Sequence, residues 1–196
     1  MEAILYPLAA SKILRHCEIF LSIMQETNGE ELIELFFNEF IASADRTIQY
    51  LHKEVNKIGG EAPVWFKNKR DNIPNINLFY QLRHIIAHHF FIPLTPIILI
   101  EGSVPREDAQ VSEYRLDLQM LPEDKKFDKQ REEFVKKFGS SLNAISLCTE
   151  YYNNLSTFLK EAEEKYGNKK YFLRAKLKTK FRVNKDLTIN IHEREY

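Results

Sequence analysis

The sequence predicts a mainly α-helical fold to which a few short β-strands and a C-terminal β-hairpin are added. Apolar residues recur at helical spacing up to residue 91 and again between 123 and 166, whereas strand-like alternation is confined to two short segments. A chain of 196 residues, 44% of them hydrophobic, is long enough to bury one substantial core. We therefore expect one helical domain over residues 1–168, with a β-insertion at about 94–121. The hairpin over residues 169–196 is expected to pack on the same domain.

Two helices open the chain. The first is expected over residues 8–25, with the Asn-Gly pair at 28–29 as its stop and turn. The second is expected over residues 30–58, because its apolar residues form one wide stripe, and the Gly-Gly pair at 59–60 ends it. The stripe consists of Ile33, Phe36, Phe37, Phe40, Ile41, Ala44, Ile48, Leu51, Val55 and Ile58.

A third main helix is expected over residues 74–91. Asp71 or Asn72 can cap its start, and Pro74 suits its first turn because the N–H that proline lacks would have no helical partner there. A shorter segment around residues 63–66 has a helical or turn-like pattern and precedes this helix.

Two strands and a further helix follow. The run PIILI at 96–100 and the alternating residues 114–120 predict strands, which the polar loop 101–110 joins. Helical spacing then resumes from about 123 to 166, where Gly139 and the two serines after it are expected to kink or split the helix.

The C-terminal segment has the clearest strand pattern in the chain. Apolar residues alternate with basic ones from 173 to 183, residues 184–186 offer a turn, and alternation resumes at 187–191, which predicts a β-hairpin. From Lys169 onward the chain has nine basic and three acidic residues, a charge of +6, so the preceding part carries −6. This segment is a candidate contact for a polyanion or for the acidic body itself. Its basic row is Arg174, Lys176, Lys178, Lys180 and Arg182.

The sequence argues against several classes of protein. No apolar run is long enough to cross a bilayer, and the N-terminus lacks a secretory signal pattern, so we expect a cytoplasmic protein without a membrane partner. Cys17 and Cys148 lack the spacing of a metal or redox pair, which favours buried free thiols. The chain contains no Gly-rich phosphate loop or nucleophile elbow.

The third helix carries one arginine and three histidines in the segment NLFYQLRHIIAHHF. His84 and His88 share a face of the helix, roughly 40° apart, whereas Arg83 and His88 are roughly 140° apart. Arg83 is nevertheless long enough to reach a phosphate near His88. His89, directly after His88, is a candidate supporting residue.

This cluster resembles the signature of the HEPN superfamily, in which an arginine, usually followed by a polar residue, precedes a histidine by four to six residues late in an all-helical bundle. The matching residues are Arg83, His84 and His88. The resemblance implies a HEPN-like bundle and a homodimer in which two such helices face each other across a shared RNA cleft. It also implies ribonuclease activity, as in many members that act as toxins or in antiphage defence, with an antitoxin or defence-system protein as a further partner.

One group of HEPN toxins carries a tyrosine two residues after the histidine, which a nucleotidyltransferase antitoxin modifies. This chain has Phe90 at that position, so we do not expect silencing of that kind. The resemblance covers residues 8–92 and the helix from about 123 to 166, and it does not extend to the strands or to the basic segment.

Metal-independent RNA cleavage suits these residue types. RNA supplies its own nucleophile, the 2′-hydroxyl, so the site needs a group that titrates near neutral pH and a fixed cation that stabilises the phosphorane. By the resemblance, His88 transfers the proton, Arg83 binds the phosphate through its planar donors, and His84 orients the substrate or transfers a second proton. No cofactor and no metal ion is expected.

Two other interpretations stand beside this one. The helix can belong to a non-catalytic HEPN-like scaffold that binds RNA or a protein, since an arginine and a histidine at this spacing also arise by chance. His84, His88 and His89 also have spacings that suit a metal ion, but no further group of ligands completes such a site in the sequence.

Asp45 and the basic row each allow two interpretations. Asp45 either supplies an acidic residue to the cleft or is a solvated position beside Arg46, and the sequence favours the solvated position. The basic row either follows an RNA backbone or forms a solvated edge strand, and the sequence favours neither.

Overall fold

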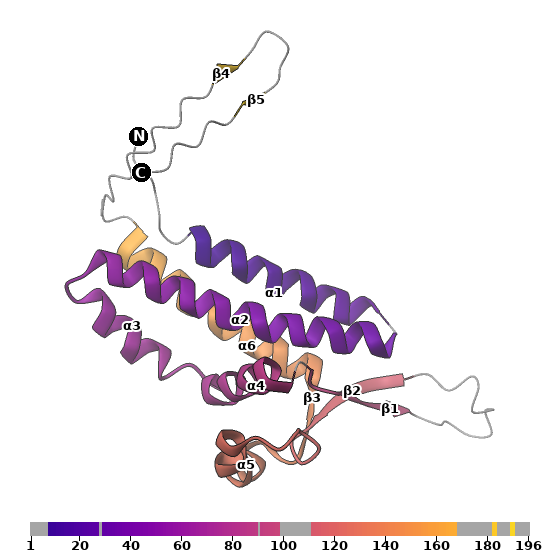
Figure 1. The fold of residues 1–196 in the computed structure, drawn as a ribbon. Helices are drawn as coiled ribbons and strands as arrows, with labels where there is room; N and C mark the ends of the chain where they lie inside the picture. The colour runs from indigo at the N-terminus through magenta and orange to yellow at the C-terminus, as the bar shows by residue number, and fades with distance from the viewer. Residues whose placement is uncertain are drawn as a thin grey trace.

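The chain is mainly helical in the computed structural model shown in Figure 1. The residues that the structure describes are 8–27, 29–89, 91–98, 111–167, 182–183 and 189–190. Their helices are α1 (Leu8–Glu26), α2 (Glu30–Ile58), α3 (Ala62–Arg70), α4 (Ile76–His89), α5 (Lys125–Phe138) and α6 (Ala144–Ala162), which the π-helical turn η2 (Glu163–Gly167) extends. Their strands are β1 (Thr95–Ile98), β2 (Val111–Asp117), β3 (Ser141–Asn143), β4 (Arg182–Val183) and β5 (Ile189–Asn190).

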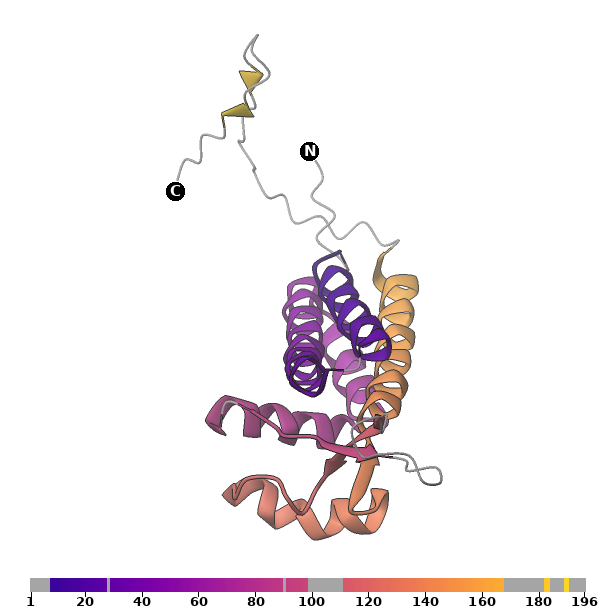
Figure 2. The same ribbon diagram turned by 90° about the vertical axis from the view of Figure 1, so that its right-hand side faces the viewer.

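The three long helices α1, α2 and α6 lie side by side and enclose much of the core (Figures 1 and 2). On α2 the predicted apolar stripe faces inward, where Phe37, Phe40 and Leu51 are fully buried. Full burial of a side chain of this size contributes about 2 kcal/mol, so the stripe is a main source of stability. The first two helices predicted from apolar spacing are confirmed, with bounds that agree to within one residue.

Gly59 ends α2 where the sequence predicts its stop. It has a φ of 71°, a left-handed conformation that favours glycine because a Cβ would crowd the backbone. Its N–H donates to the carbonyl of Val55 at 3.1 Å. The turn leads into α3, which is longer than the segment predicted around 63–66.

α4 begins at Ile76, two residues later than predicted. Asn75 has a φ of 64°, so the right-handed helix cannot extend upstream through it, and Pro74 lies in the preceding turn. Asparagine tolerates this conformation better than most residues. The Asn75 side chain donates to Oε1 of Glu150 at 3.2 Å, which links the start of α4 to α6. The predicted caps at 71–72 were therefore wrong.

A three-stranded antiparallel sheet of order β1-β2-β3 stands at one end of the long helices (Figure 1). Leu116 of β2 pairs with Leu142 of β3. The pairing of β1 with β2 confirms the predicted strands, whereas β3 was not predicted because three residues carry too little alternation. β3 arises where Gly139, with a φ of 86°, separates α5 from α6, and the predicted helix over 123–166 is therefore split.

β4 and β5 form a separate two-stranded sheet. Arg182 pairs with Asn190 and Val183 with Ile189, which is the antiparallel pairing expected of a hairpin. Several predicted features lie outside the described residues, namely the turn at 184–186, Phe90, the loop 101–110 and the other members of the basic row. The other members of that row are Arg174, Lys176, Lys178 and Lys180.

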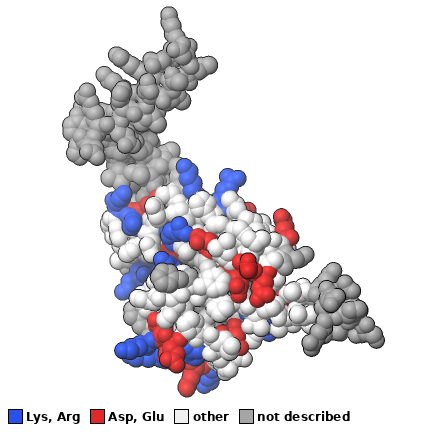
Figure 3. Space-filling model, turned by 45° about the vertical axis from the view of Figure 1, so that its right-hand side comes forward, with Lys and Arg blue, Asp and Glu red and all other residues white. Residues whose placement is uncertain are grey.

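On the face shown in Figure 3, basic and acidic side chains are interspersed, and neither sign covers it. Among the helices that the structure describes, none combines the length and apolar character that crossing a membrane requires. Cys17 and Cys148 are buried free thiols, as predicted, and burial raises the pKa of Cys17 to about 12.

Candidate functional site

α4 carries the predicted cluster and runs across the long helices (Figure 2). Its inner side is apolar, and Leu82 and Ile85 are fully buried. Its outer side is open to solvent. Tyr80 is 59% exposed there, and His88 is also exposed. Helical spacing thus puts the cluster at the border of core and solvent, where side chains are both held in place and accessible.

The segment that follows α4 is attached to α2. The buried side chain of Asn38 accepts a hydrogen bond from the N–H of Ile92 at 2.9 Å and donates to its carbonyl at 3.1 Å. Oε1 of Glu34 accepts from the N–H of Leu94 at 2.7 Å. Removing a buried partner of this kind costs about 1–3 kcal/mol, because polar groups are left unpaired. These bonds fix the end of the helix that carries His88.

The first turn of α4 is held against α6 by an aromatic pair. The rings of Phe79 and Tyr151 lie 3.7 Å apart at an interplanar angle of 8°, and both residues are buried. Such a stack contributes about 0.5–1.5 kcal/mol beyond the burial of the rings. Arg83 and His84 follow Phe79 by about one turn, so the stack also limits where their side chains can lie.

Arg83 faces Asp45 of α2. Nε of Arg83 lies 3.7 Å from Oδ2 of Asp45, and the two side chains are 35% and 21% exposed. Nε2 of Gln49 donates to the same carboxylate oxygen at 2.6 Å. Burial raises the pKa of Asp45, and the positive charge of Arg83 opposes this rise. Asp45 is thus a neighbour of the cluster, not the solvated position beside Arg46 that the sequence favoured.

His84 lies between His88 and Asp124. The ring centroids of the two histidines are 4.3 Å apart, with an edge-on angle of 67°. Nε2 of His84 is 3.5 Å from Oδ2 of Asp124, and these side chains are 20% and 10% exposed. Oδ1 of Asp124 accepts from the N–H of Phe127 at 3.1 Å and so caps α5. One carboxylate therefore both orients His84 and begins α5.

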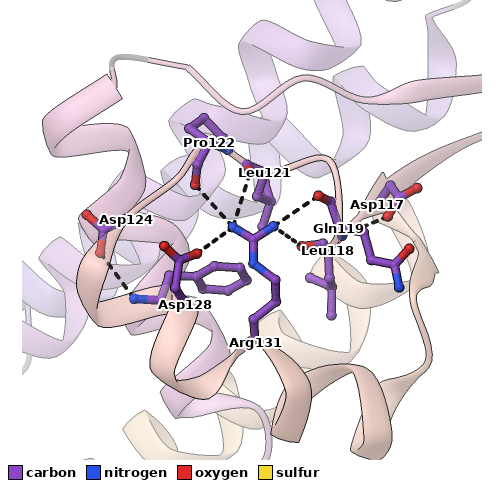
Figure 4. A network of polar contacts seen from close by, with 9 residues as sticks. Asp117, Leu118, Gln119, Leu121, Pro122, Asp124, Asp128 and Arg131 are labelled. Carbon is purple, nitrogen blue, oxygen red and sulfur yellow. Dashed lines mark hydrogen bonds and ion pairs between the residues drawn. The ribbon is translucent and has the colours of Figure 1, made fainter.

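Arg131 of α5 fixes the turn that leads to Asp124 (Figure 4), the residue whose carboxylate faces His84. Its guanidinium donates at distances from 3.0 to 3.4 Å to four carbonyl groups, and at 2.7 Å to Oδ1 of Asp128. Hydrogen bonds from a charged donor are stronger than neutral ones, so this turn has little freedom. The four carbonyls belong to Leu118, Gln119, Leu121 and Pro122.

The structure brings some predicted site residues together and leaves others apart. His84 and His88 are in contact, whereas no hydrogen bond or ion pair joins Arg83 to either histidine in the part of the chain that the structure describes. His89 is exposed at the end of α4. Within the described ranges, no three or more His, Cys, Asp or Glu side chains gather in a way that would hold a metal ion.

Sequence reasoning missed Asp124 and Arg131. Asp124 stands just before α5 and three residues before Phe127, which is an N-cap pattern that the sequence does contain. Its contact with His84 has no such local signal, because it depends on the path of the intervening strands and turn. The four carbonyls that Arg131 binds likewise cannot be predicted from the spacing of residues in the sequence.

Comparisons with known proteins find no relative. No family model, curated protein or solved structure matches the chain.

Proposed function

We propose that the chain is a HEPN-type domain that cleaves RNA without a metal ion. One observation carries the proposal: His84 and His88 are in ring contact on the accessible side of α4, directly after Arg83. Two imidazoles and a guanidinium are the groups that supply the proton transfer and the positive charge that RNA cleavage needs. The mainly helical fold around α4 is compatible with a HEPN-like bundle.

In the proposed reaction, the 2′-oxygen of RNA attacks the adjacent phosphorus while the bond from phosphorus to the 5′-oxygen breaks. His88 accepts the proton of the 2′-hydroxyl, and Arg83 donates to the phosphoryl oxygens as negative charge develops on them. His84, oriented by Asp124, donates a proton to the departing 5′-oxygen. The products are a 2′,3′-cyclic phosphate and a 5′-hydroxyl end.

We further propose that the active form is a homodimer in which two α4 helices face each other. Arg83 is directed to α2 by Asp45, whereas His84 is directed to the start of α5 by Asp124. A single chain therefore separates the cation from the imidazoles, and a second α4 can bring His88 of one chain to Arg83 of the other. Mixing Arg83→Ala and His88→Ala chains should then restore cleavage, since each mixed dimer contains one intact site. No recovery in mixed dimers contradicts the shared site.

Cleavage of RNA by the purified full chain in EDTA tests the ribonuclease. We expect the wild type to leave cyclic phosphate ends, and Arg83→Ala or His88→Ala to lower the rate by about 100-fold or more. His16→Ala is a matched control, because His16 is an exposed histidine on α1. Cleavage that is unchanged in both site variants, or that requires a metal ion, contradicts the proposal.

A ribonuclease of this kind acts on cytoplasmic RNA as a toxin or an antiphage effector, under the control of an antitoxin or another defence protein. Expression of the wild type and of His88→Ala in a host cell tests this role. We expect growth arrest with the wild type alone. Equal growth of the two strains at equal protein levels contradicts it.

A second candidate function is a non-catalytic HEPN-like scaffold that binds RNA or a protein. The observation in its favour is that Arg83 and His84 already face the carboxylates of Asp45 and Asp124, so the cluster can simply tie α4 to α2 and α5. In that case the wild-type protein does not cleave RNA, and the only effect of Arg83→Ala is to lower the stability of the fold. The cleavage assay in EDTA therefore separates the two functions.

The basic row of the C-terminal segment is a proposed second RNA contact. Replacing its five basic residues with glutamine should weaken RNA binding and flatten its salt dependence, because fewer counterions are released on binding. RNA affinity that does not change at any salt concentration favours the solvated edge strand instead.

A further inference from the structure

A cavity of about 440 Å³ lies beside the candidate site, with walls from α2, α3, α4 and α6. Small-molecule sites have volumes of roughly 300–1,000 Å³, so this one can hold a ligand the size of a nucleoside. Asp45 lines the cavity, and its carboxylate also faces Arg83 at 3.7 Å. The cavity and the proposed phosphate-binding residue thus share a neighbour.

Five aromatic rings line the cavity beside isoleucine and polar side chains. Phe66 is buried, and the imidazole of His52 stacks on it with ring centroids 4.9 Å apart and an interplanar angle of 10°. Tyr151, held by its stack on Phe79, forms another wall, and the exposed Tyr80 lies at the rim. Flat aromatic surfaces suit nucleobases, because every base has a π face that can stack.

One edge of the cavity offers acceptors from α2, while the guanidinium of Arg70, which also lines the cavity, is paired with Asp71 at 2.6 Å. Asp45 and Gln49 line it from adjacent turns of α2, and their mutual hydrogen bond uses Nε2 of Gln49 and Oδ2 of Asp45. That bond leaves Oδ1 of Asp45 and Oε1 of Gln49 to accept hydrogen bonds from a ligand. Acceptors of this kind pair with the exocyclic amino groups of bases.

We propose that this cavity binds one nucleobase of the RNA next to the scissile phosphate and prefers a base with an exocyclic amino group. Adenine, guanine and cytosine offer such a group to Asp45, whereas uracil offers on that edge only its ring N3–H, flanked by two carbonyl oxygens that the carboxylate repels. Tyr80 precedes Arg83 by three residues, a rise of about 4.5 Å along α4, so one nucleotide can reach both. The RNA part of this inference rests on the proposed ribonuclease.

The first experiment needs no cleavage. Binding of AMP, GMP, CMP and UMP to the wild-type chain is measured by equilibrium dialysis and by NMR titration. We expect the three amino-bearing nucleotides to bind about tenfold more tightly than UMP, as the loss of a hydrogen bond to a charged group predicts. Equal affinity for UMP, or no binding of any of the four, overturns the inference.

Two variants locate the site. Tyr80→Ala removes a stacking surface and Gln49→Leu removes an acceptor, so each should weaken AMP, GMP and CMP binding by about tenfold. Tyr50→Ala is a matched control, because Tyr50 is an exposed tyrosine of α2 outside the cavity, and it should bind as the wild type does. Binding that neither variant weakens places the nucleotide elsewhere and overturns the inference.

Cleavage of oligonucleotides that differ by one base next to the cut site distinguishes this inference from the ribonuclease itself. We expect Tyr80→Ala and Gln49→Leu to lose the preference against uracil. If RNA is cut with an unchanged base preference by both variants, the cavity inference fails and the ribonuclease stands. If nucleotides bind in the expected order and RNA is not cut, the ribonuclease fails and the cavity is a site for a free nucleotide.

Discussion

Asp124 lies 3.5 Å from Nε2 of His84 through one carboxylate oxygen and caps α5 through the other. The two roles have different chemical requirements. Capping needs an oxygen that accepts from a backbone N–H, whereas orienting an imidazole that gains and loses a proton benefits from a negative charge. Substitutions at Asp124 can therefore separate the stability of the fold from the chemistry of the site.

Asp124→Asn keeps a capping oxygen and removes the charge, so unfolding free energy should change by less than about 0.5 kcal/mol while RNA cleavage slows about tenfold or more. Asp124→Ala should slow cleavage and also cost about 1 kcal/mol of stability. Urea unfolding and single-turnover cleavage measure the two effects. Full activity in Asp124→Asn would show that Asp124 serves only as a cap.

Asn143 provides the matched control for the cap. Its side chain accepts from the N–H of Ser146 at 2.8 Å at the start of α6. Asn143→Ala removes this cap and the hydrogen bond that Nδ2 donates to Oε2 of Glu113 at 2.8 Å, so stability should fall by about 1–3 kcal/mol, at least as much as in Asp124→Ala, with cleavage unchanged. A similar loss of activity in both alanine variants would mean that lowered stability, and not the contact with His84, reduces cleavage.

Asp45→Asn should make the protein more stable and less active. Burial raises the pKa of Asp45, so its ionised form destabilises the fold at neutral pH, and this cost disappears as pH falls towards the ordinary value of 3.8. The gain in unfolding free energy should thus be larger at pH 7 than at pH 4. Cleavage should slow by about 10- to 100-fold, because Arg83 loses the partner that orients it.

Glu39→Gln is the control for Asp45→Asn, because Glu39 forms an exposed pair with Arg46 on the same helix. Exposed pairs contribute about 0–1 kcal/mol, so this variant should change little in stability and nothing in cleavage. Faster cleavage in Asp45→Asn would reverse the assignment and make Asp45 a group that blocks Arg83.

Arg131→Lys should loosen the turn before α5. Lysine keeps the charge but cannot donate to four carbonyl groups at once, so we expect a loss of about 2 kcal/mol in unfolding free energy. Amide hydrogen exchange should rise in residues 118–124, and cleavage should slow because Asp124 no longer holds His84. Unchanged exchange in this turn would show that other contacts hold it.

Glu54 should make stability fall as pH rises. The residue is 5% exposed, and its Oε2 atom has no hydrogen-bond partner among the residues that the structure describes. Burial raises the pKa of Glu54 from 4.5 to about 7, so the folded state holds a proton that the unfolded chain releases. The resulting stability is full below pH 4.5 and is lost as pH rises through about 7.

Glu54→Gln removes this titration. Between pH 5 and pH 8 the wild type should lose about 2 kcal/mol of unfolding free energy that the variant does not lose. Urea unfolding of both proteins at both pH values measures this difference. A pH-independent offset from the new amide does not affect this difference. Glu31→Gln, at an exposed position of α2, should show no such change. A constant difference between Glu54→Gln and the wild type would refute the raised pKa.

Local patterns in the sequence determined the helices and the position of the cluster. The wide apolar stripe defined α2, and its Gly59 stop followed from the conformational freedom of glycine. The same helical periodicity put His84 and His88 on one face and Arg83 on another. The contacts of these three side chains in the structure agree with that placement. Each of these features depends on residues within a few turns of one another.

Tertiary structure alone decided what surrounds the cluster. Asp45 faces Arg83, and Asp124 faces His84, because α2 and the turn before α5 pack on opposite sides of α4, and no spacing rule links positions so far apart in the sequence. The cavity likewise needs walls from four helices at once. The sequence by itself thus determined which side chains share a helix face. Packing decided which charges and rings they meet, because those contacts depend on the full path of the chain.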